Sequence, residues 1–200
     1  MKTGKTVKVL LTAATAAGML AGCGSKTDTD TFRFASELDI QGMDSTVVDD
    51  GMSYNAIHAI TDGLTAVNEK GKTAPAIAKS WDVSDDGKTY TFHLRDAKWS
   101  NGDKVTANDF VYSWRKIIKN AGNYAYMLGS EGASVKNADA LMELGTNATD
   151  EQMATLGVTA KDDKTLVVEL ENKVPYFTDL MAFPCYFPQN EKFVEKCGKN

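Results

Sequence analysis

Cysteine and histidine are scarce in this 200-residue sequence, which contains three cysteines and two histidines. Metal sites draw heavily on these side chains, and no His-Glu-x-x-His motif is present. His58 falls in a predicted helix and His93 alternates within a predicted strand, so a structural role is the simpler interpretation of both. Cys185 and Cys197 could pair or remain free thiols, and their spacing does not decide this. The sequence therefore predicts neither a metal ion nor another cofactor.

Motifs for nucleotide binding and nucleophilic catalysis are also missing. Gly-Lys-Thr occurs three times, but never with the earlier glycine that a phosphate-binding P-loop requires. No Gly-x-Ser-x-Gly nucleophile elbow is present. The carboxylate pairs Asp85-Asp86 and Asp162-Asp163 lie in predicted turns, where aspartate is favoured because it bonds to the local backbone. We therefore predict no catalytic residue and expect the chain not to be an enzyme.

Long apolar runs are absent as well. The apolar and small residues at positions 9–20 form a run shorter than the ~20 residues that a membrane-spanning helix needs. Lys2, Lys5 and Lys8 precede this run, and small residues follow it. This order of basic, apolar and small residues is typical of a secretory signal peptide, which we predict at residues 1–22.

The signal segment ends in Leu20-Ala21-Gly22-Cys23, which resembles the lipobox of bacterial lipoproteins. The resemblance implies cleavage before Cys23 and lipidation of its thiol, whereas an ordinary signal peptide with a chance cysteine is the alternative. Lipid chains there would anchor the protein at the outer face of the cytoplasmic membrane, exposed to the cell surface or the periplasm. The small and polar residues that follow predict a flexible tether over residues 23–30.

Acidic residues outnumber basic ones in the rest of the chain. The formal net charge is −5 for the whole sequence and −8 without the three signal lysines. An acidic surface argues against nucleic acid as a partner, because the phosphate backbone is itself negatively charged.

Hydrophobic periodicity and turn residues predict the elements that follow the tether. They are a strand over residues 31–40, a polar loop over 43–51, a helix over 52–64, and a turn with an extended link around Pro75. Ile57, Ile60 and Leu64 would share one face of the helix, with Gly63 near its stop. Two hairpins are predicted further on, over residues 80–94 and 158–170, because apolar residues alternate on both sides of Asp-containing turns.

The stretch between the hairpins combines a turn, a helix start and an apolar stripe. Asn101-Gly102 predicts a tight turn, and Thr106 with Asp109 predicts a capping box. The stripe consists of Phe110, Trp114, Ile117 and Ile118. Trp81, Trp99 and Trp114 could be sugar-stacking platforms or core residues, and the helical position of Trp114 favours the core. A second capping box is predicted at Thr149 and Gln152, so helices and hairpins interleave and the class is mixed α/β.

Residues 74–114, APAIAKSWDVSDDGKTYTFHLRDAKWSNGDKVTANDFVYSW, closely resemble the signature region of the family 5 extracellular solute-binding proteins. This family includes the oligopeptide- and dipeptide-binding lipoproteins of bacterial ABC importers. The matching residues are Ala78, Trp81, the Asp-Gly turn, Tyr90-Thr91-Phe92, Leu94-Arg95, Lys98-Trp99-Ser100, Gly102, Val105-Thr106-Ala107 and Asp109-Phe110. The resemblance extends to residues 43–51, 62–64 and 174–188, so it covers nearly the whole mature chain.

The resemblance implies a two-lobe, periplasmic-binding-protein-like (type II) α/β fold with ligand enclosed between the lobes and an α/β subdomain inserted in lobe one. Because family members are more than twice this length, we expect an N-terminal fragment without the second lobe. The expected segments are the start of lobe one at residues 31–61, the inserted subdomain at 62–190 and a return to lobe one at 191–200.

The resemblance also implies a function. The chain would belong to the extracytoplasmic substrate-binding component of an ABC transporter, which captures short peptides and delivers them to permease and ATPase subunits. Ligand contacts in the family come from the loop after the first strand and from a tyrosine after the signature helix. The corresponding residues are Asp49, Asp50, Gly51 and Tyr124, and a packing role is the alternative for Tyr124.

Other functions stay open at this point. The same family also includes binders of non-peptide solutes, such as glycans and nickel chelates. A surface lipoprotein that acts as a sensor or adhesin is a second class, and a secreted enzyme with its active site beyond residue 200 is a third.

Overall fold

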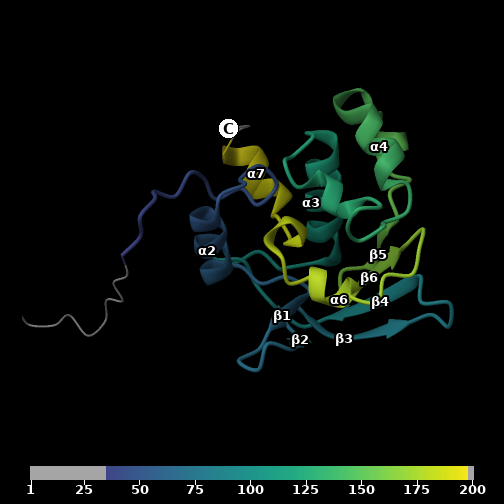
Figure 1. Ribbon diagram of the computed structural model, residues 1–200, viewed down its shortest axis with the longest axis horizontal. Coiled ribbons are helices and arrows are strands. Elements are labelled where there is room, and N and C mark those ends of the chain that lie inside the picture. The colour runs from purple at the N-terminus through teal and green to yellow at the C-terminus, as the bar shows by residue number, and fades with distance from the viewer. Residues whose placement is uncertain (1–34, 198–200) are drawn as a thin grey trace, which may run out of the picture. The chain divides into compact units, whose positions relative to one another are not determined.

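An antiparallel sheet with one long helix across one face is the centre of the fold (Figure 1). The structure is a computed structural model that describes residues 35–197. Of the described residues, those from Leu38 onward belong to one compact unit. The predicted signal peptide, Cys23 and the tether therefore lie outside the described residues.

The four-stranded sheet combines two hairpins that are distant in the sequence. Its strand order is β3 (Ala78–Val83), β4 (Thr89–Leu94), β6 (Thr165–Glu169) and β5 (Val158–Asp162), with every neighbouring pair antiparallel. Both predicted hairpins are confirmed. Their turns use aspartate as expected, because the Asp86 carboxylate accepts from the Lys88 N–H at 3.0 Å and the Asp162 carboxylate accepts from the Lys164 N–H at 2.8 Å.

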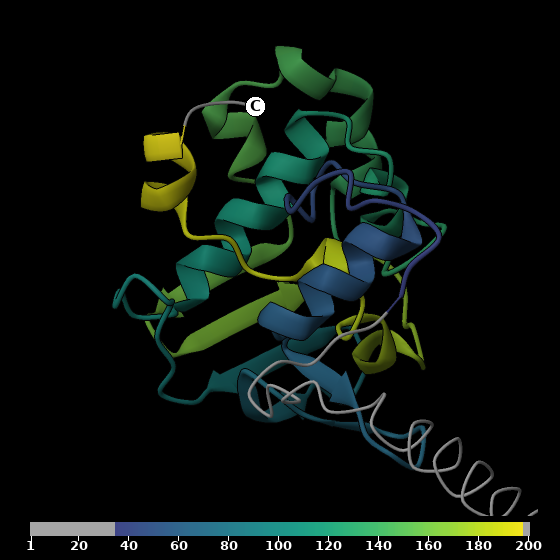
Figure 2. The same cartoon turned by 90° about the vertical axis from the view of Figure 1, so that its left-hand side faces the viewer.

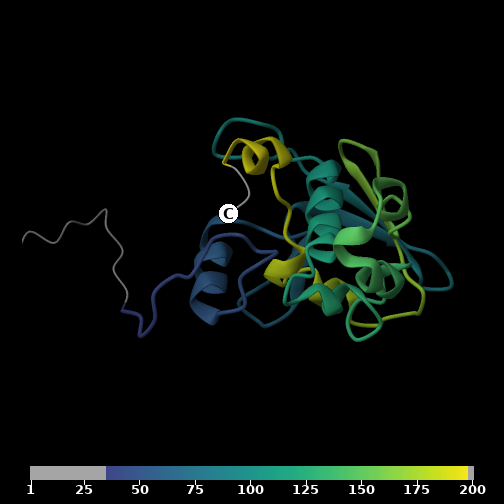
Figure 3. The ribbon, with the colours of Figure 1, turned by 90° about the horizontal axis from the view of Figure 1, so that it is seen from above.

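The inner face of the sheet is apolar because side chains alternate along each strand. Tyr90, Phe92 and Leu94 of β4 are buried, and the intervening residues are only partly covered. On β6, Leu166 and Val168 continue the same face. The long helix α3 (Ala107–Lys119) covers this face, as Figure 3 shows from above.

Helix α3 begins and packs as its sequence predicts. The Thr106 N–H donates to Oδ2 of Asp109 at 2.7 Å, which is the carboxylate half of a capping box. The apolar stripe of Phe110, Trp114, Ile117 and Ile118 has no exposed surface. The Trp114 indole N–H donates to the Tyr186 carbonyl oxygen at 2.9 Å, so this buried polar group is also satisfied. The core interpretation of Trp114 is thus confirmed.

The remaining elements are short and surround α3 and the sheet. They are α2 (Gly51–Ile60), β1 (Thr65–Val67), β2 (Thr73–Pro75), η1 (Ala125–Leu128), α4 (Ala138–Leu144), η2 (Gly145–Asn147), α5 (Asp150–Met153), α6 (Phe177–Leu180), η3 (Pro184–Tyr186) and α7 (Glu191–Cys197). The capping box of α5 is confirmed, since Thr149 and Gln152 bond to each other's backbone N–H.

Two sequence predictions near the start of the described region are wrong. No strand forms over residues 35–40, the described part of the predicted strand 31–40. The predicted helix forms as α2, but it ends at Ile60, which is 72% exposed, while Leu64 lies beyond the helix and is fully buried. The predicted link at Pro75 is extended as expected, but it also pairs with β1 as strand β2 of a hairpin.

A close backbone approach explains why the chain leaves helical geometry after Ile60. A Cβ atom on Gly63 would lie 2.3 Å from the Met181 carbonyl oxygen, so only glycine fits there. This contact brings Leu64 into the main core, where it packs with residues of the sheet and α3. Tertiary packing has therefore overridden the helical periodicity that joined Leu64 to Ile57.

The two cysteines of the described region do not pair. Cys185 is buried within η3 and Cys197 is exposed at the end of α7. Burial raises the pKa of the Cys185 thiol, which keeps it protonated and unreactive.

Trp114 gives a test of this core in the complete protein. Trp114→Ala should lower the free energy of unfolding by about 3–5 kcal/mol, because a fully buried ring is lost. Trp114→Phe should cost about 1–3 kcal/mol, because the Tyr186 carbonyl loses its donor. Tyr176→Ala, which removes a ring that is 51% exposed, is the matched control. Urea unfolding measures all three, and equal stability of Trp114→Ala and the control would contradict this core.

Candidate functional site

The loop before α2 carries Asp49 and Asp50, two of the predicted ligand residues, and a small second core holds it in place. Val48, Tyr54, Ile57 and Phe187 form this core, apart from the main one. The Tyr54 hydroxyl donates to the Val48 carbonyl oxygen at 2.8 Å within it. Figure 2 shows α2 on the same side of α3 as the connector from η3 to α7. The loop is therefore attached to α2 on one side and to the connector on the other.

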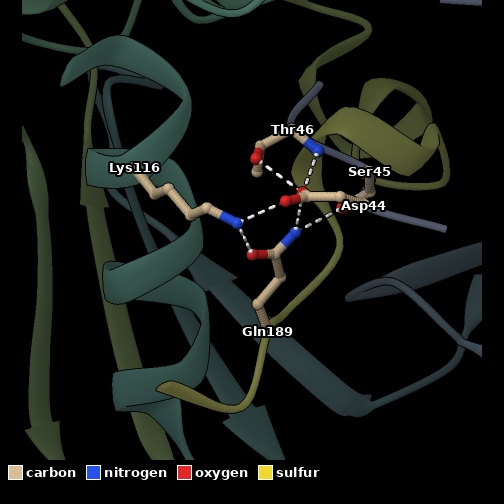
Figure 4. Close-up of polar contacts among 5 residues, drawn as sticks. All are labelled: Asp44, Ser45, Thr46, Lys116 and Gln189. Carbon is tan, nitrogen blue, oxygen red and sulfur yellow. Dashed lines mark hydrogen bonds and ion pairs between the residues drawn. The ribbon is translucent and has the colours of Figure 1, made fainter. Parts of the chain in front are cut away.

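A network of polar side chains begins this loop (Figure 4). Oδ1 of Asp44 accepts from the Thr46 N–H at 3.0 Å, the Thr46 hydroxyl at 2.7 Å and the Gln189 amide at 2.6 Å. Oδ2 of Asp44 accepts from the Lys116 ammonium at 2.5 Å. The same ammonium donates to Oε1 of Gln189 at 2.9 Å, and the Gln189 amide donates to the Ser45 hydroxyl at 3.2 Å. We call these five residues the Asp44 network.

The Asp44 network alters the ionisation of its central carboxyl group. Burial by itself would raise the pKa of Asp44, but the hydrogen bonds from Lys116, Thr46 and Gln189 together outweigh it and lower the pKa. The carboxylate is thus charged at neutral pH and paired with a lysine whose side chain is only 14% exposed. The pair is stronger than an exposed ion pair because three further donors share the charge.

The middle of the loop approaches the segment after α3. A Cβ atom on Gly122 would lie 2.2 Å from the Thr46 carbonyl oxygen, so glycine is required for this contact. Next to it, the Asn123 amide donates to Oδ2 of Asp49 at 2.8 Å. These contacts join the exposed Asp49 to the segment that follows α3, and Tyr124 is the next residue of that segment.

Tyr124 belongs to a group of aromatic rings. Its ring centroid lies 5.4 Å from that of Tyr54, 5.4 Å from that of Phe183 and 5.9 Å from that of Tyr126. Tyr124 is partly buried, whereas Tyr126 is 43% exposed and stacks on it. The packing interpretation of Tyr124 therefore has a structural basis, and the residue before it, Asn123, bonds to Asp49.

Asp50 and Gly51 occupy the start of α2. Oδ1 of Asp50 accepts from the Ser53 N–H at 2.8 Å, which makes Asp50 the N-cap residue of the helix. Hydrogen bonds to Ser53 and Met52 lower the pKa of Asp50. Gly51 is exposed, and a Cβ atom there would meet no neighbour within 4 Å. Asp50 is therefore engaged inside the protein, whereas Asp49 presents its carboxylate to solvent.

Sequence reasoning missed the residues that hold the loop. Asp44, Lys116, Gln189 and Asn123 come from four separate segments, and nothing in their local patterns marks them as partners. Their role in holding the loop arises only when the chain folds and brings them into contact with it. The one available signal was the glycine before Asn123, because a glycine that follows a helix often permits a close backbone approach.

The histidines, tryptophans and acidic side chains are the candidates for other kinds of site, such as sites for metals or sugars. Between residues 35 and 197, no group of three His, Cys, Asp or Glu side chains could hold a metal ion. Nε2 of His93 lies 2.8 Å from Oδ2 of Asp82, across two neighbouring strands. Trp81 and Trp99 are half-buried, and the Trp99 indole N–H points to Oδ2 of Asp109 at 3.4 Å. In the same range, no helix combines the length and apolar character needed to cross a bilayer.

Solved structures similar to this chain include the substrate-binding domain of a transporter and an OppA protein in a complex. The substrate-binding domain of an oligopeptide ABC transporter from Bacillus anthracis has a TM-score of 0.76 and 41% identity, over 83% of this chain and 31% of that one. OppA of Haemophilus influenzae, in complex with the peptide RPPGFSPFR, has a TM-score of 0.72 and 39% identity, over 80% of this chain and 30% of that one. The mixed α/β class and the type II binding-protein fold, which the sequence analysis predicted, agree with both structures.

The chain belongs to the bacterial extracellular solute-binding proteins, family 5. Residues 72–199 match the family described as "Bacterial extracellular solute-binding proteins, family 5 Middle". A dipeptide-binding protein of Lactococcus lactis is 40% identical over 100% of this chain and 35% of its own length. The oligopeptide-binding protein OppA of Bacillus subtilis is 43% identical over 76% of this chain and 27% of its own length. The chain thus spans about a third of the length of these relatives.

The lowered pKa of Asp44 predicts a dependence of stability on pH. Because the folded-state pKa lies below the ordinary value of 3.8, the stabilisation is complete above 3.8 and is lost as the pH falls through the folded pKa. Asp44→Asn should therefore be less stable than the parent at neutral pH by about 1 kcal/mol, a figure reduced for partial exposure. Urea unfolding at decreasing pH should show this gap closing.

Asp85→Asn is the control for this measurement, because Asp85 is an exposed residue of the β3–β4 turn. It should match the parent protein at neutral pH, which separates the network from the simple loss of one charge. A gap between Asp44→Asn and the parent that stayed constant down to the lowest pH would contradict the assigned role of the carboxylate.

Proposed function

We propose that this chain is part of the extracytoplasmic peptide-binding component of an ABC importer. Membership of the family supports this, together with relatives whose names specify dipeptides or oligopeptides. The captured peptide would be delivered to permease and ATPase subunits for import. The role is binding and not catalysis, so no cofactor takes part.

The proposed domain organisation follows from the same relationship. Residues 31–61 would start the first lobe, 62–190 would form its inserted subdomain and 191–200 would return to the lobe. The ligand would be enclosed between this lobe and a second one, which accounts for the greater length of the relatives. Lipid on Cys23 would hold the protein at the outer face of the membrane, next to the permease.

The exposed carboxylate of Asp49 carries the proposal at the level of single residues. A receptor for mixed peptides must bind what all peptides share, namely the main chain and the charged termini. Asp49 is exposed and can accept from peptide N–H groups or an ammonium, and it already accepts from Asn123, the residue before Tyr124. Side-chain pockets can meanwhile stay roomy, because water-bridged contacts are nearly as favourable enthalpically as direct ones.

A non-peptide solute is the second candidate, because one relative has such a name. The probable deoxycholate-binding periplasmic protein YgiS of Escherichia coli is 35% identical over 84% of this chain and 30% of its own length. A steroid acid has an apolar body and one carboxylate, and the acidic Asp49 would repel that carboxylate. The charge of the loop therefore favours a ligand that presents N–H groups or a cation.

Calorimetry on the complete protein, including any sequence that follows Asn200, tests the peptide proposal. Short peptides of varied sequence should bind, whereas deoxycholate, an oligosaccharide and a nickel chelate should not. Asp49→Ala should weaken peptide binding by about tenfold or more, as expected when a charge-assisted hydrogen bond is lost. Tight binding of a non-peptide ligand, with no heat from any peptide, would replace this proposal with the second candidate.

Tyr124 is tested in the same assay with two variants. Tyr124→Ala should weaken peptide binding without unfolding the protein, and Tyr124→Phe separates the hydroxyl from the packed ring. Tyr176→Ala removes an exposed tyrosine of another segment and should bind like the parent. If Tyr124→Ala and the parent bind peptides equally, the ring serves only the packing that surrounds it.

The lipid anchor is tested by metabolic labelling. The protein expressed in bacteria with a labelled fatty acid should incorporate the label, and Cys23→Ala should not, because the thiol is the attachment point. Cys197→Ala, which removes an exposed cysteine at the other end, should be labelled like the parent. Equal labelling of Cys23→Ala and the parent would disprove the anchor.

A further inference from the structure

We propose that Lys116 and Gln189 are positioning residues for the ligand site, because they hold the loop that carries Asp49 against the segment that carries Tyr124. This assignment rests on the proposed function and goes beyond it, since neither side chain needs to touch a ligand. Both act through Asp44, which lies five residues before Asp49 in the same loop. The geometry joins them by direct bonds, as Figure 4 shows.

The network connects three segments that the backbone does not connect locally. Lys116 lies in the last turns of α3, Gln189 lies in the connector before α7, and Asp44 begins the loop. The connector is itself fixed to α3, because the Gln189 N–H donates to the Asp109 carbonyl oxygen at 3.2 Å. The Asp44 carboxylate is therefore held by Lys116 of α3 and by Gln189 of the connector, whose backbone is bonded to α3.

The held position of Asp44 determines the rest of the loop. The N–H groups of Val47 and Val48 donate to the Asp44 carbonyl oxygen at 3.0 and 3.1 Å, which forms a turn directly after the network. This turn leads to Asp49, whose carboxylate meets Asn123 at 2.8 Å. Asn123 and Tyr124 follow α3 in sequence, so helix α3 sets both sides of the Asp49–Tyr124 pair.

The network also decides which acid of the loop faces a ligand. The loop and the helix start contain three carboxyl groups, those of Asp44, Asp49 and Asp50. Asp44 is paired with Lys116, and Asp50 caps α2 through Ser53. Asp49 alone of the three is exposed and bonds only to a neutral amide among its described contacts. Without Lys116, the Asp44 charge would be uncompensated and would compete for cationic groups of a ligand.

A structural role alone would give a different pattern of effects. The stripe of α3 that packs on the sheet contains Trp114 and Ile117, which belong to the main core. No residue of the Asp44 network belongs to that core. The Asp44 side chain is 35% exposed, so the network lies at the edge of the protein. Loss of the network should therefore leave the core folded and change the position of the loop.

Lys116→Met tests this assignment in the complete protein, because it keeps the aliphatic chain and removes the ammonium donors. Peptide affinity measured by calorimetry should fall by roughly tenfold or more, the order seen when a group that orients a ligand-contacting residue is removed. Gln189→Leu should have a similar effect, and Lys116→Arg should retain most of the affinity. Thermal unfolding of each variant should remain cooperative, which shows that the fold is intact.

The matched control is Lys119→Met. Lys119 lies on the same helix and forms an ion pair with Asp150 at 2.8 Å, away from the loop. The Lys119→Met variant removes the same charge from the same helix, and its peptide affinity should equal that of the parent. Equal losses of affinity in Lys116→Met and Lys119→Met would assign the effect to net charge and overturn the proposal.

A double-mutant cycle shows whether Lys116 acts through the site. In the Asp49→Ala, Tyr124→Ala background, Lys116→Met should weaken binding little further, because the groups that it positions are already gone. An undiminished loss in that background would overturn the positioning role. If Lys116→Met binds peptides like the parent, this inference fails while the proposed function stands. If the parent binds no peptide, the proposed function fails and the inference fails with it.

Discussion

The burial of one face of α3 against the four-stranded sheet is the interaction on which the rest of the structure depends. Four residues of that face have no exposed surface, and the strands below them come from two hairpins far apart in the sequence. The helix also carries Lys116 and is followed by Gly122, Asn123 and Tyr124. Any change in the packing of α3 would therefore move both the anchor of the loop and the predicted ligand residues. This explains how a sequence signature with scaffold residues alone can determine the geometry of the candidate site.

The loop that carries Asp49 is held mainly by polar contacts, and this follows from its composition. Residues 43–51 offer few apolar side chains, so hydrophobic burial contributes little beyond Val48. A polar loop can be held in one position only if its buried groups find partners. Asp44 obtains them from Lys116 and Gln189, and the price is a charged pair at a partly exposed position. Such a pair contributes modestly to stability, but its directional bonds define one position of the loop.

Local sequence patterns predicted the elements whose hydrogen bonds and apolar contacts are local. Both hairpins, the capping box at Thr149 and the stripe of α3 follow from turn residues and periodicity within each segment. Predictions failed where a distant contact overrode the local pattern. Leu64 left the predicted helix because Gly63 packs against Met181, and β1 with β2 formed a hairpin where a simple link was expected. The candidate site shows the same division. Asp49 and Tyr124 were predicted from the family resemblance, whereas the Asp44 network joins three segments that are distant in the sequence.

This separation of core and loop agrees with the proposed role in binding peptides of varied sequence. Stability resides in α3 and the sheet, which share a continuous apolar core. Recognition is assigned to a loop whose exposed carboxylate contributes nothing to that core, so the residues around Asp49 can change with little effect on folding. Close relatives with names that specify different ligands then pose no conflict, because the same scaffold can present different loops. Such changes must keep the anchor of the loop at Asp44. A loop without this anchor would become ordered only when a ligand binds, and the entropy lost in ordering it would reduce the affinity.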